Sequence, residues 1–495
     1  MRMPVPDTPT IARRQQIVGA LRRIVPDGVI ADEAAMRPYE CDGLAVYRQI
    51  PLVVVLPSTV EQVSAILRYC NANNVKIVPR GAGTSLSGGA LPLADAVTIG
   101  LGRFNRILEI DWDNRCVVAQ PGVTNLAITN AVQHRGFYYA PDPSSQIACS
   151  IGGNVAENAG GVHCLKYGLT TNNVLGLQIV LPDGEVVRVG GRHQPEGEGY
   201  DLMGLLTGSE GLLGIVTEVT VRILRKPETV RAMLMGFASN EAAGDAVAAI
   251  IGAGVVPAGL EMMDRLAIHA AEEFVHAGYP LDVEALLIAE LDGPQAEVDY
   301  LVERVAAIAA RCGAACVRVS ASEDERLRFW AGRKAAFPAV GRISPDYLCM
   351  DGTIPRRRLA EVLARIRALS EKHGLRVANV FHAGDGNLHP LILFDANRPG
   401  ELERAEEFGA DILRLCVEVG GVLTGEHGVG VEKRDLMPVM FDEVDLEQQQ
   451  RVKCAFDAGG LLNPGKVFPT LHNCAEMGRL RVSGGQLPFP DLPRF

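Results

Sequence analysis

The sequence has no apolar run of the ~18 residues needed for a membrane-spanning helix, no cluster of cysteines and no excess of basic residues. Its eleven cysteines are scattered, which excludes a zinc ribbon or an iron–sulfur cluster, since both need three or four neighbouring thiolates. Reduced thiols in a cytoplasmic protein are therefore expected. The net charge of −11 argues against nucleic-acid binding, because nucleic-acid-binding proteins present a basic face to phosphates.

The length of 495 residues predicts two or three compact units. Gly 53 and Pro 29 make up about 17% of the chain, which indicates many tight loops. The first 25 residues carry five arginines and one acidic residue, as organelle presequences do. They contain no serine, however, and Ile17, Leu21 and Ile24 follow helical spacing, so a helix docked on the surface is predicted.

Hydrophobic periodicity divides the chain near Lys226–Pro227. Before this point we predict a helix capped by Ser58 and Glu61, a buried strand at 75–79, and further strands at 96–101, 115–122, 176–189 and 215–223. After it, strands and helices alternate, which predicts an open α+β sheet with its helices on one face. The strands are expected at 284–293, 350–355, 375–382 and 389–395, and the helices at 294–313 and 356–374. From about Glu432 the chain is predicted to be helical and then to pack back on an earlier domain.

Three stretches of small residues are candidates for binding a cofactor. The first, PRGAGTSLSGGA at 79–90, offers bare backbone N–H groups and short hydroxyls that can surround a pyrophosphate. It is neither a GxGxxG motif that opens a long helix nor a GxxxxGK[ST] loop, so a nicotinamide-binding Rossmann unit is disfavoured. PDPSS at 141–145 with SIGGNVAENAGG at 150–161 forms a second stretch, and TGSEGLLGIVTEV at 207–219 a third.

Two histidines flank an Asp–Gly turn in FHAGDGNLHP. If Asp385–Gly386 forms a two-residue hairpin turn, His382 faces His389 directly, with Cβ atoms ~5 Å apart. That spacing suits two imidazoles that share one divalent metal, although a pair of polar residues at the ends of strands remains the alternative. Downstream, VLTGEHGVG supplies Glu426 and His427 between glycines. A carboxylate and two imidazoles make a three-ligand site with an open position, which is typical of a catalytic metal; zinc, manganese or iron would suit it.

The order PRGAGTSLSGG, PDP, IGGN-x3-NAGG and GSEG-x2-GIVTEV resembles the FAD-binding domain of the vanillyl-alcohol oxidase/PCMH flavoprotein family. Within that family the chain is similar to the D-2-hydroxyacid dehydrogenase branch and its FAD-linked glycolate oxidase type, over roughly residues 40 to 470. The resemblance implies an α+β protein of two domains: an FAD domain built of two α+β subdomains, and a substrate or cap domain with an antiparallel sheet. We place an N-terminal helical segment at 1–45, the FAD domain at 46–226, the cap domain at 227–430, and a returning helical segment at 431–495.

The resemblance also implies site residues. Backbone amides of the first stretch would hold the FAD pyrophosphate, the second stretch would line the flavin, the third would line the adenine and ribose, and Asn463 of NPGK would return to the isoalloxazine. The implied FAD-binding residues are Arg80, Gly81, Ala82, Gly83, Thr84, Ser85, Pro143, Ser144, Ser145, Gly152, Gly153, Asn154, Gly160, Gly161, Glu210, Gly214, Ile215 and Asn463. No histidine occurs within these loops before His163, so non-covalent FAD is expected.

For the chemistry, the resemblance assigns His382, His389 and Glu426 as ligands of a zinc-like ion and His427 as the catalytic base. It matches Arg333 to the arginine that grips the substrate carboxylate; Arg328, Lys334 and Arg342 are nearby competitors, and Asn387 would add a hydrogen bond to the same anion. Hydroxyglutarate-specific relatives carry a lysine where this chain has Leu348-Cys349-Met350, which favours a short monocarboxylate.

The predicted function is oxidation of glycolate or D-lactate to the 2-oxoacid, with transfer of hydride to flavin and of electrons to partners. The implied partners are a second flavin-fold subunit and an iron–sulfur subunit, either in the cytoplasm or at the inner face of the membrane. Three alternatives remain open: a stand-alone D-lactate or D-2-hydroxyglutarate dehydrogenase, a flavin electron-transfer subunit without a substrate site, and a nucleotide-binding protein without flavin.

Overall fold

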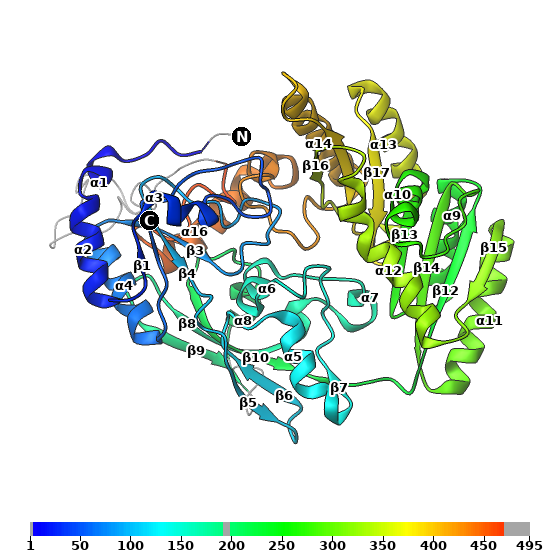
Figure 1. Ribbon diagram of the computed structural model, residues 1–495, viewed down its shortest axis with the longest axis horizontal. Coiled ribbons are helices and arrows are strands. Elements are labelled where there is room, and N and C mark those ends of the chain that lie inside the picture. The colour runs from blue at the N-terminus through cyan, green and yellow to red at the C-terminus, as the bar shows by residue number, and fades with distance from the viewer. Residues whose placement is uncertain (1–2, 192–198, 470–495) are drawn as a thin grey trace, which may run out of the picture.

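The computed structural model describes residues 3–191 and 199–469, which form two lobes joined near residues 226–228 (Figure 1). The first lobe holds two sheets. One has the order β1-β2-β4-β3, with β4 parallel to both of its neighbours, and the other is an antiparallel sheet of order β5-β6-β10-β8-β9. A short β7–β11 pair lies beside them. The strands are β1 Val29–Ile30, β2 Val53–Val55, β3 Lys76–Arg80, β4 Ala96–Gly100, β5 Ile107–Asp111, β6 Cys116–Ala119, β7 Phe137–Tyr138, β8 Val174–Val180, β9 Val186–Gly190, β10 Ile215–Arg222 and β11 Leu224–Arg225.

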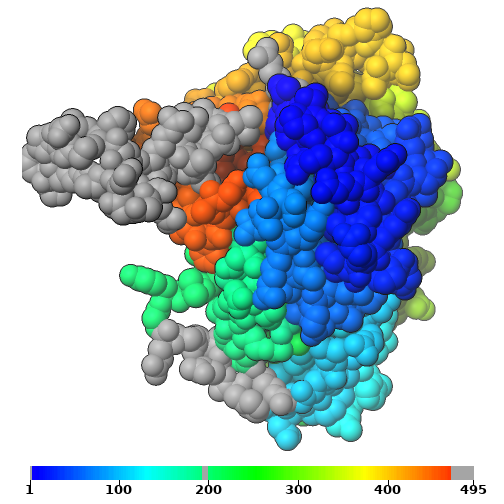
Figure 2. Space-filling model, turned by 90° about the vertical axis from the view of Figure 1, so that its left-hand side faces the viewer, coloured from blue at the N-terminus to red at the C-terminus, as the bar shows by residue number. Residues whose placement is uncertain are grey.

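Helices of this lobe pack against the sheets. They are α1 Thr8–Ala12, α2 Arg14–Ile24, α3 Glu33–Met36, α4 Val60–Ala72, α5 Asn125–Val132, α6 Ile151–Glu157, α7 Cys164–Tyr167 and α8 Leu202–Leu206. The predicted docked N-terminal helix is α2, whose Ile17 and Leu21 are buried against the core around β2 and α4. In Figure 2 the N-terminal residues (blue) lie directly on the light-blue part of this lobe.

The cap of α4 lies one residue later than predicted. Thr59, rather than Ser58, accepts the backbone N–H of Gln62 at 3.3 Å, and the Gln62 side chain accepts the backbone N–H of Ser58 at 2.7 Å. Gln62 thus fills the position assigned to Glu61, but its side chain binds the residue before the cap rather than the N–H of the cap residue Thr59.

The second lobe is built on one antiparallel sheet of order β15-β12-β14-β13-β17-β18-β16. This confirms the predicted architecture, an α+β lobe with an antiparallel sheet beside a lobe of two α+β subdomains. Its strands are β12 Thr229–Phe237, β13 Gly259–Asp264, β14 Ala285–Gly293, β15 Ala314–Val319, β16 Asp346–Cys349, β17 Val377–Phe381 and β18 Pro390–Phe394. Its helices are α9 Asn240–Gly252, α10 Arg265–Val275, α11 Gln295–Arg311, α12 Glu323–Val340, α13 Leu359–His373 and α14 Glu401–Glu418.

Helices lie on both faces of this sheet, so the prediction of helices on one face is wrong. Successive residues of β12 alternate between two cores: Met233 and Met235 pack with α9, α11, α13 and α14, whereas Ala232 and Leu234 pack with α10 and α12. The central strand β14 is buried along nearly its whole length, and its sequence ALLIAELDG reads as a near-continuous apolar run rather than an alternating one. Such a run is typical of a strand covered on both faces, so a signal of the second helical layer was present in the sequence.

The predicted strand at 350–355 is also wrong. The strand is β16, which ends at Cys349, and Thr353 forms only isolated bridges with Asn387 and Val422. The buried carboxylate of Asp351 turns inward to bind the backbone of 425–427, which takes this segment out of the sheet.

The C-terminal part returns to the first lobe, as Figure 1 shows in orange. Helices α15 Met437–Met440 and α16 Glu443–Phe456 lead to residues 461–463, where the backbone N–H of Ile77 donates to Leu461 and that of Asn463 donates to Ile77. The domain limits assigned from the sequence stay a prediction. None of the described helices has both the length and the apolar composition needed to cross a membrane.

Candidate functional site

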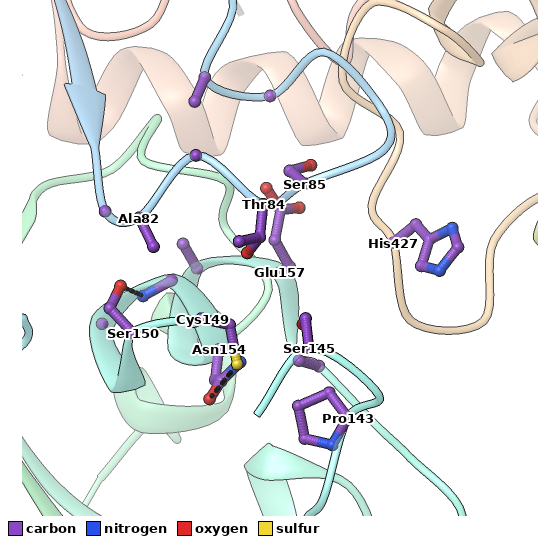
Figure 3. A pocket seen from close by; sticks show the side chains of 18 of the residues that line it. Ala82, Thr84, Ser85, Pro143, Ser145, Cys149, Ser150, Asn154, Glu157 and His427 are labelled. Carbon is purple, nitrogen blue, oxygen red and sulfur yellow. Dashed lines mark hydrogen bonds between the residues drawn. The ribbon is translucent and has the colours of Figure 1, made fainter. Parts of the chain in front are cut away.

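A cavity of about 490 Å³ lies between the two lobes, within the usual size range of ligand pockets. Loops at 79–90, 143–159 and 206–216 line it from the first lobe, and side chains of 334–347, 389 and 426–427 line it from the second. Figure 3 shows Thr84 and Ser85 on one loop, Ser150 at the N-terminal cap of α6, Asn154 within α6, and His427 on a loop that faces them across the space. The three small-residue stretches of the sequence therefore meet at one place.

Most of the predicted FAD-binding residues line this cavity. They are Arg80, Gly81, Ala82, Gly83, Thr84, Ser85, Pro143, Ser144, Ser145, Gly152, Gly153, Asn154, Glu210, Gly214 and Ile215. Gly160, Gly161 and Asn463 do not. A Cβ atom on Gly160 would lie 2.6 Å from Oε2 of Glu426, so this glycine lets the second loop approach the histidine cluster. Asn463 is buried beneath the loops, where its amide donates to the carbonyls of Gly89 and Glu210.

Gly83 shows why the first loop needs glycine. Its φ is +74°, and a Cβ atom there would lie 2.1 Å from the Arg80 guanidinium. That guanidinium donates to the carbonyl of Cys41 at 2.7 Å, which fixes a cation beside the loop at the end of β3.

Glu210 ties the cofactor loops to the second lobe. Its carboxylate accepts the backbone N–H groups of Val429 at 2.6 Å and Gly430 at 2.7 Å. It lines the cavity as predicted, but its oxygens hold the segment that follows Glu426 and His427. Burial raises the pKa of Glu210, and burial together with the Glu210 charge raises the pKa of the neighbouring Glu157 well above its ordinary value.

The histidine hairpin has a different register from the prediction. His382 pairs with Asn387 rather than with His389, and the ladder continues as Asn379↔Pro390. The turn is wider because the N–H of Gly384 donates to Leu260 of β13 rather than across the hairpin, and the N–H of Gly386 closes on the His382 carbonyl. The shift is two residues, so His382 and His389 still project from the same face. Their ring centroids lie 4.9 Å apart.

Glu426 joins these two rings. Its Oε1 lies 3.2 Å from Nε2 of His382 and 3.3 Å from Nε2 of His389. All three side chains are buried or nearly so. Burial alone would raise the pKa of Glu426, but the contacts with the two imidazoles outweigh it and hold that pKa well below its ordinary value.

Two acidic residues that the sequence analysis missed support this cluster. Glu261 on β13 accepts from Nδ1 of His382 at 2.8 Å, and Asp351 accepts the backbone N–H of His427 at 2.8 Å as well as those of residues 425 and 426. The fully buried Lys433 pairs with Asp351 at 3.2 Å. A usable signal was present, since each acid interrupts a short apolar run, GLEMMD and LCMDG.

His427 lies beside the cluster, and its ring stacks on that of His389 at 4.9 Å and 9°. Burial lowers the pKa of His427 to about 4, against the opposing charge of Asp351. The ring is thus neutral near pH 7, and its Nδ1 atom has no hydrogen-bond partner among the described residues.

Arg333 and Asn387 do not line the cavity but lie against the cluster. Arg333 is 3% exposed, and its Nη2 lies 2.6 Å from Oε2 of Glu261. This contact is an ion pair without hydrogen-bond alignment, so Nε and Nη2 of Arg333 have no hydrogen-bond acceptor among the described residues. The carbonyl oxygen of the Asn387 amide is likewise buried without a partner in the described structure. Buried donors and acceptors are normally satisfied, so such a group of exceptions indicates a polar ligand.

Sequence reasoning also missed part of the second lobe's contribution, because Phe337 and Pro338 of α12 and Tyr347 of β16 line the cavity. Lys334, named from the sequence as a competitor of Arg333, lines it as well. The Phe337 ring lies edge-on to His389 at 6.1 Å between centroids. These residues form the wall next to the histidine cluster.

Two family profiles match the chain: "FAD binding domain" over residues 51–190 and "FAD linked oxidases, C-terminal domain" over residues 226–467. The chain belongs to the FAD-linked oxidases of the vanillyl-alcohol oxidase/PCMH family. Residues of both matched regions line the cavity between the lobes, and the chain is an FAD-dependent oxidoreductase.

Relatives within this family include the glycolate oxidase subunit GlcD of Escherichia coli strain K12, which is 58% identical over 97% of both chains. GlcD of Bacillus subtilis is 37% identical over 90% of this chain and 94% of its own. A D-lactate dehydrogenase of Anaerostipes hadrus is 32% identical over 91% of this chain and 97% of its own. Among solved structures, p-cresol methylhydroxylase has a TM-score of 0.79 at 18% identity, covering 93% of this chain and 98% of its own, which shows a shared fold.

Proposed function

We propose that this FAD-linked oxidase oxidises a short 2-hydroxyacid, glycolate or D-lactate, to the 2-oxoacid. The observation that carries the proposal is the convergence of two imidazoles, a carboxylate, a neutral histidine and a buried arginine at one end of the FAD-binding cavity. The relatives named glycolate oxidase and D-lactate dehydrogenase support the same substrate class.

The donor set fits a divalent metal. The two Nε2···Oε1 distances of 3.2 and 3.3 Å match the edge of about 3.3 Å expected between ligands of a tetrahedral ion with bonds near ~2.05 Å. All three ligand atoms lie within 4.8 Å of one another. His382, His389 and Glu426 would therefore hold a zinc-like ion, with manganese or iron as further options.

When bound, FAD supplies the hydride acceptor, and a divalent ion supplies the positive charge that lowers the pKa of the substrate hydroxyl. His427 accepts the hydroxyl proton on its neutral imidazole, which Asp351 positions through the backbone N–H. Phe337, Pro338 and Tyr347 limit the access of water to this end of the cavity.

The substrate carboxylate is held by Arg333 and Asn387. The Nε and Nη2 atoms of Arg333 are donors without acceptors in the described structure, and a guanidinium binds a carboxylate with two parallel hydrogen bonds. Asn387 orients the same anion with its amide, which lies 3.5 Å from Nε2 of His389.

The size of the substrate depends on the cations near the cavity. The segment Leu348-Cys349-Met350 contains no lysine, and these three residues are buried in the apolar cores. Lys334 is, however, a second cation on the lining. A competition assay between short and dicarboxylic hydroxyacids therefore shows whether the substrate is glycolate or D-lactate, or the alternative, D-2-hydroxyglutarate.

FAD is held without a covalent bond. Both ring nitrogens of His163 are engaged, with Asp142 at 2.8 Å and Glu290 at 2.9 Å, so this histidine is not available to the flavin. Release of all flavin on acid precipitation is the expected result, and flavin that stays with the precipitate would contradict it.

Electrons leave to partner subunits. The eleven cysteines include no cluster that could hold an iron–sulfur centre, and two relatives are named as subunits of glycolate oxidase. A second flavin-fold subunit and an iron–sulfur subunit would receive the electrons, in the cytoplasm or at the inner face of the membrane. Co-purification of such subunits, with faster flavin reoxidation in the complex than in the isolated chain, is the expected result.

The function is tested by measuring chelator-sensitive reduction of the bound flavin by each hydroxyacid. Substrate-dependent bleaching that disappears after metal removal and returns with added Zn²⁺ supports an enzyme. A flavin that no hydroxyacid reduces would instead favour an electron-transfer subunit.

A further inference from the structure

Glu261 is the one residue that touches both a proposed metal ligand and the proposed carboxylate-binding arginine among the described contacts. It lies in β13, where the segment GLEMMD is buried throughout, and its own exposure is 1%. β13 pairs with β17 as Met262↔Phe381, and continuing that register by one residue sets Glu261 opposite His382. The strand pairing therefore fixes the position of the carboxylate.

One oxygen of Glu261 acts on the metal ligand. Oε1 accepts from Nδ1 of His382 at 2.8 Å, so the proton of this imidazole lies on Nδ1. Nε2 is then a lone-pair donor directed toward Glu426. A carboxylate in this position fixes the tautomer and the orientation of a metal-binding histidine.

The other oxygen acts on the arginine. Oε2 lies 2.6 Å from Nη2 of Arg333, which comes from α12 on the same face of the sheet. A carboxylate with 1% exposure is costly without such partners, so both contacts are needed to keep it charged.

We propose that Glu261 is a positioning residue that couples the metal site to substrate binding. Its two oxygens set the distance between the ion held by His382 and the guanidinium of Arg333. This distance in turn determines how far apart the hydroxyl and the carboxylate of a substrate can lie when the ion and Arg333 bind them together. This inference rests on the proposed function, but its first readout, metal affinity, does not.

The experiment compares Glu261→Gln with a matched control, Glu290→Gln. Glu290 lies in the neighbouring strand β14, is 4% exposed, and likewise sits between a histidine and an arginine, His163 at 2.9 Å and Arg326 at 2.7 Å. Zinc affinity is measured by equilibrium dialysis, flavin content by absorbance, and kcat and KM with glycolate. Glu261→Asp serves as the second variant, because it keeps the charge but shortens the reach by one methylene.

Glu261→Gln is expected to weaken zinc binding about 10- to 100-fold and to raise KM, while flavin content stays at the wild-type level. Glu290→Gln is expected to leave zinc affinity unchanged, and Glu261→Asp to weaken it less than Glu261→Gln does. Equal zinc affinities in Glu261→Gln and the wild type would overturn the inference, as would equal weakening in both Gln variants or a wild type that binds no zinc. If zinc binding depends on Glu261 but no hydroxyacid reduces the flavin, the positioning role of Glu261 at the metal site stands, whereas its coupling to substrate binding and the proposed function fail.

Discussion

The imidazole of His427 lies parallel to that of His389, 4.9 Å away between ring centroids. The proposed base therefore lies next to a proposed metal ligand, but it is not one of the two histidines whose Nε2 atoms contact Glu426. Replacing His427 by Ala or Gln should leave flavin and metal bound but lower kcat about 10²- to 10⁴-fold, the usual size of a general-base contribution. Stopped-flow flavin reduction measures the step directly. Undiminished reduction in either variant would remove His427 from this role.

Loss of a proposed metal ligand should weaken metal binding without changing flavin binding. His382→Ala removes one of two Nε2 atoms that converge on Glu426, and metal affinity should fall by more than the about 10- to 100-fold typical of residues behind a ligand. Flavin content should not change, because His382 does not line the cavity. Elemental analysis with flavin absorbance on one sample gives both values. Retention of stoichiometric metal in His382→Ala would contradict the assignment.

Arg333 should act mainly on substrate binding. Arg333→Lys keeps a charge but loses the fork of parallel donors, and Arg333→Met loses both. Loss of charged hydrogen bonds worth about 1.5–3 kcal/mol predicts a fall in kcat/KM of about 10- to 150-fold in Arg333→Met. Lys334→Gln is the neighbouring control, expected to spare glycolate and to affect only a dicarboxylic substrate. A larger effect of Lys334→Gln on glycolate would transfer the role to Lys334.

His163 should make stability depend on pH. It bridges Asp142 of the first lobe and Glu290 of the second. Burial alone would lower the pKa of His163, but Asp142 and Glu290 raise it well above its ordinary value. His163 and Arg326 in turn hold the pKa of Glu290 at about 2, although burial alone would raise it.

The stabilisation from the raised pKa of His163 is complete below the histidine pKa of the unfolded chain, ~6.5, and is lost as pH rises through the pKa of His163 in the folded protein. The stabilisation from the lowered pKa of Glu290 is lost as pH falls from ~4.5 toward about 2. His163→Gln should therefore cost about 1.5–3 kcal/mol between roughly pH 4.5 and 6.5, and less at alkaline pH. Urea unfolding of both proteins across pH measures this difference. A cost that stays constant up to strongly alkaline pH would show that the histidine charge is not involved.

The two-domain α+β architecture, and the grouping of the small-residue loops around one cavity, could be predicted from the sequence because both depend on local patterns. Small-residue loops after strands predicted the cavity, and the Asp385–Gly386 turn predicted that His382 and His389 share a face. The pleat has period two, so even a register error of two residues left this conclusion intact.

Other parts depend on contacts between distant segments, which local patterns do not encode. The hairpin register is set by Gly384 bonding to Leu260, and the loop with Glu426 by Asp351 and by Glu210 from the other lobe. Glu261 and Asp351 could be noticed as acids within apolar runs, but which side chains they contact follows only from the three-dimensional pairing of strands.

The most direct test is anaerobic mixing of the purified, metal-loaded protein with glycolate, D-lactate, L-lactate and D-2-hydroxyglutarate in turn, while the oxidised-flavin absorbance is followed. The account predicts rapid bleaching with glycolate or D-lactate, little or none with L-lactate and D-2-hydroxyglutarate, and loss of bleaching in His427→Ala. Bleaching by none of the four acids, or full bleaching after metal removal, would contradict it.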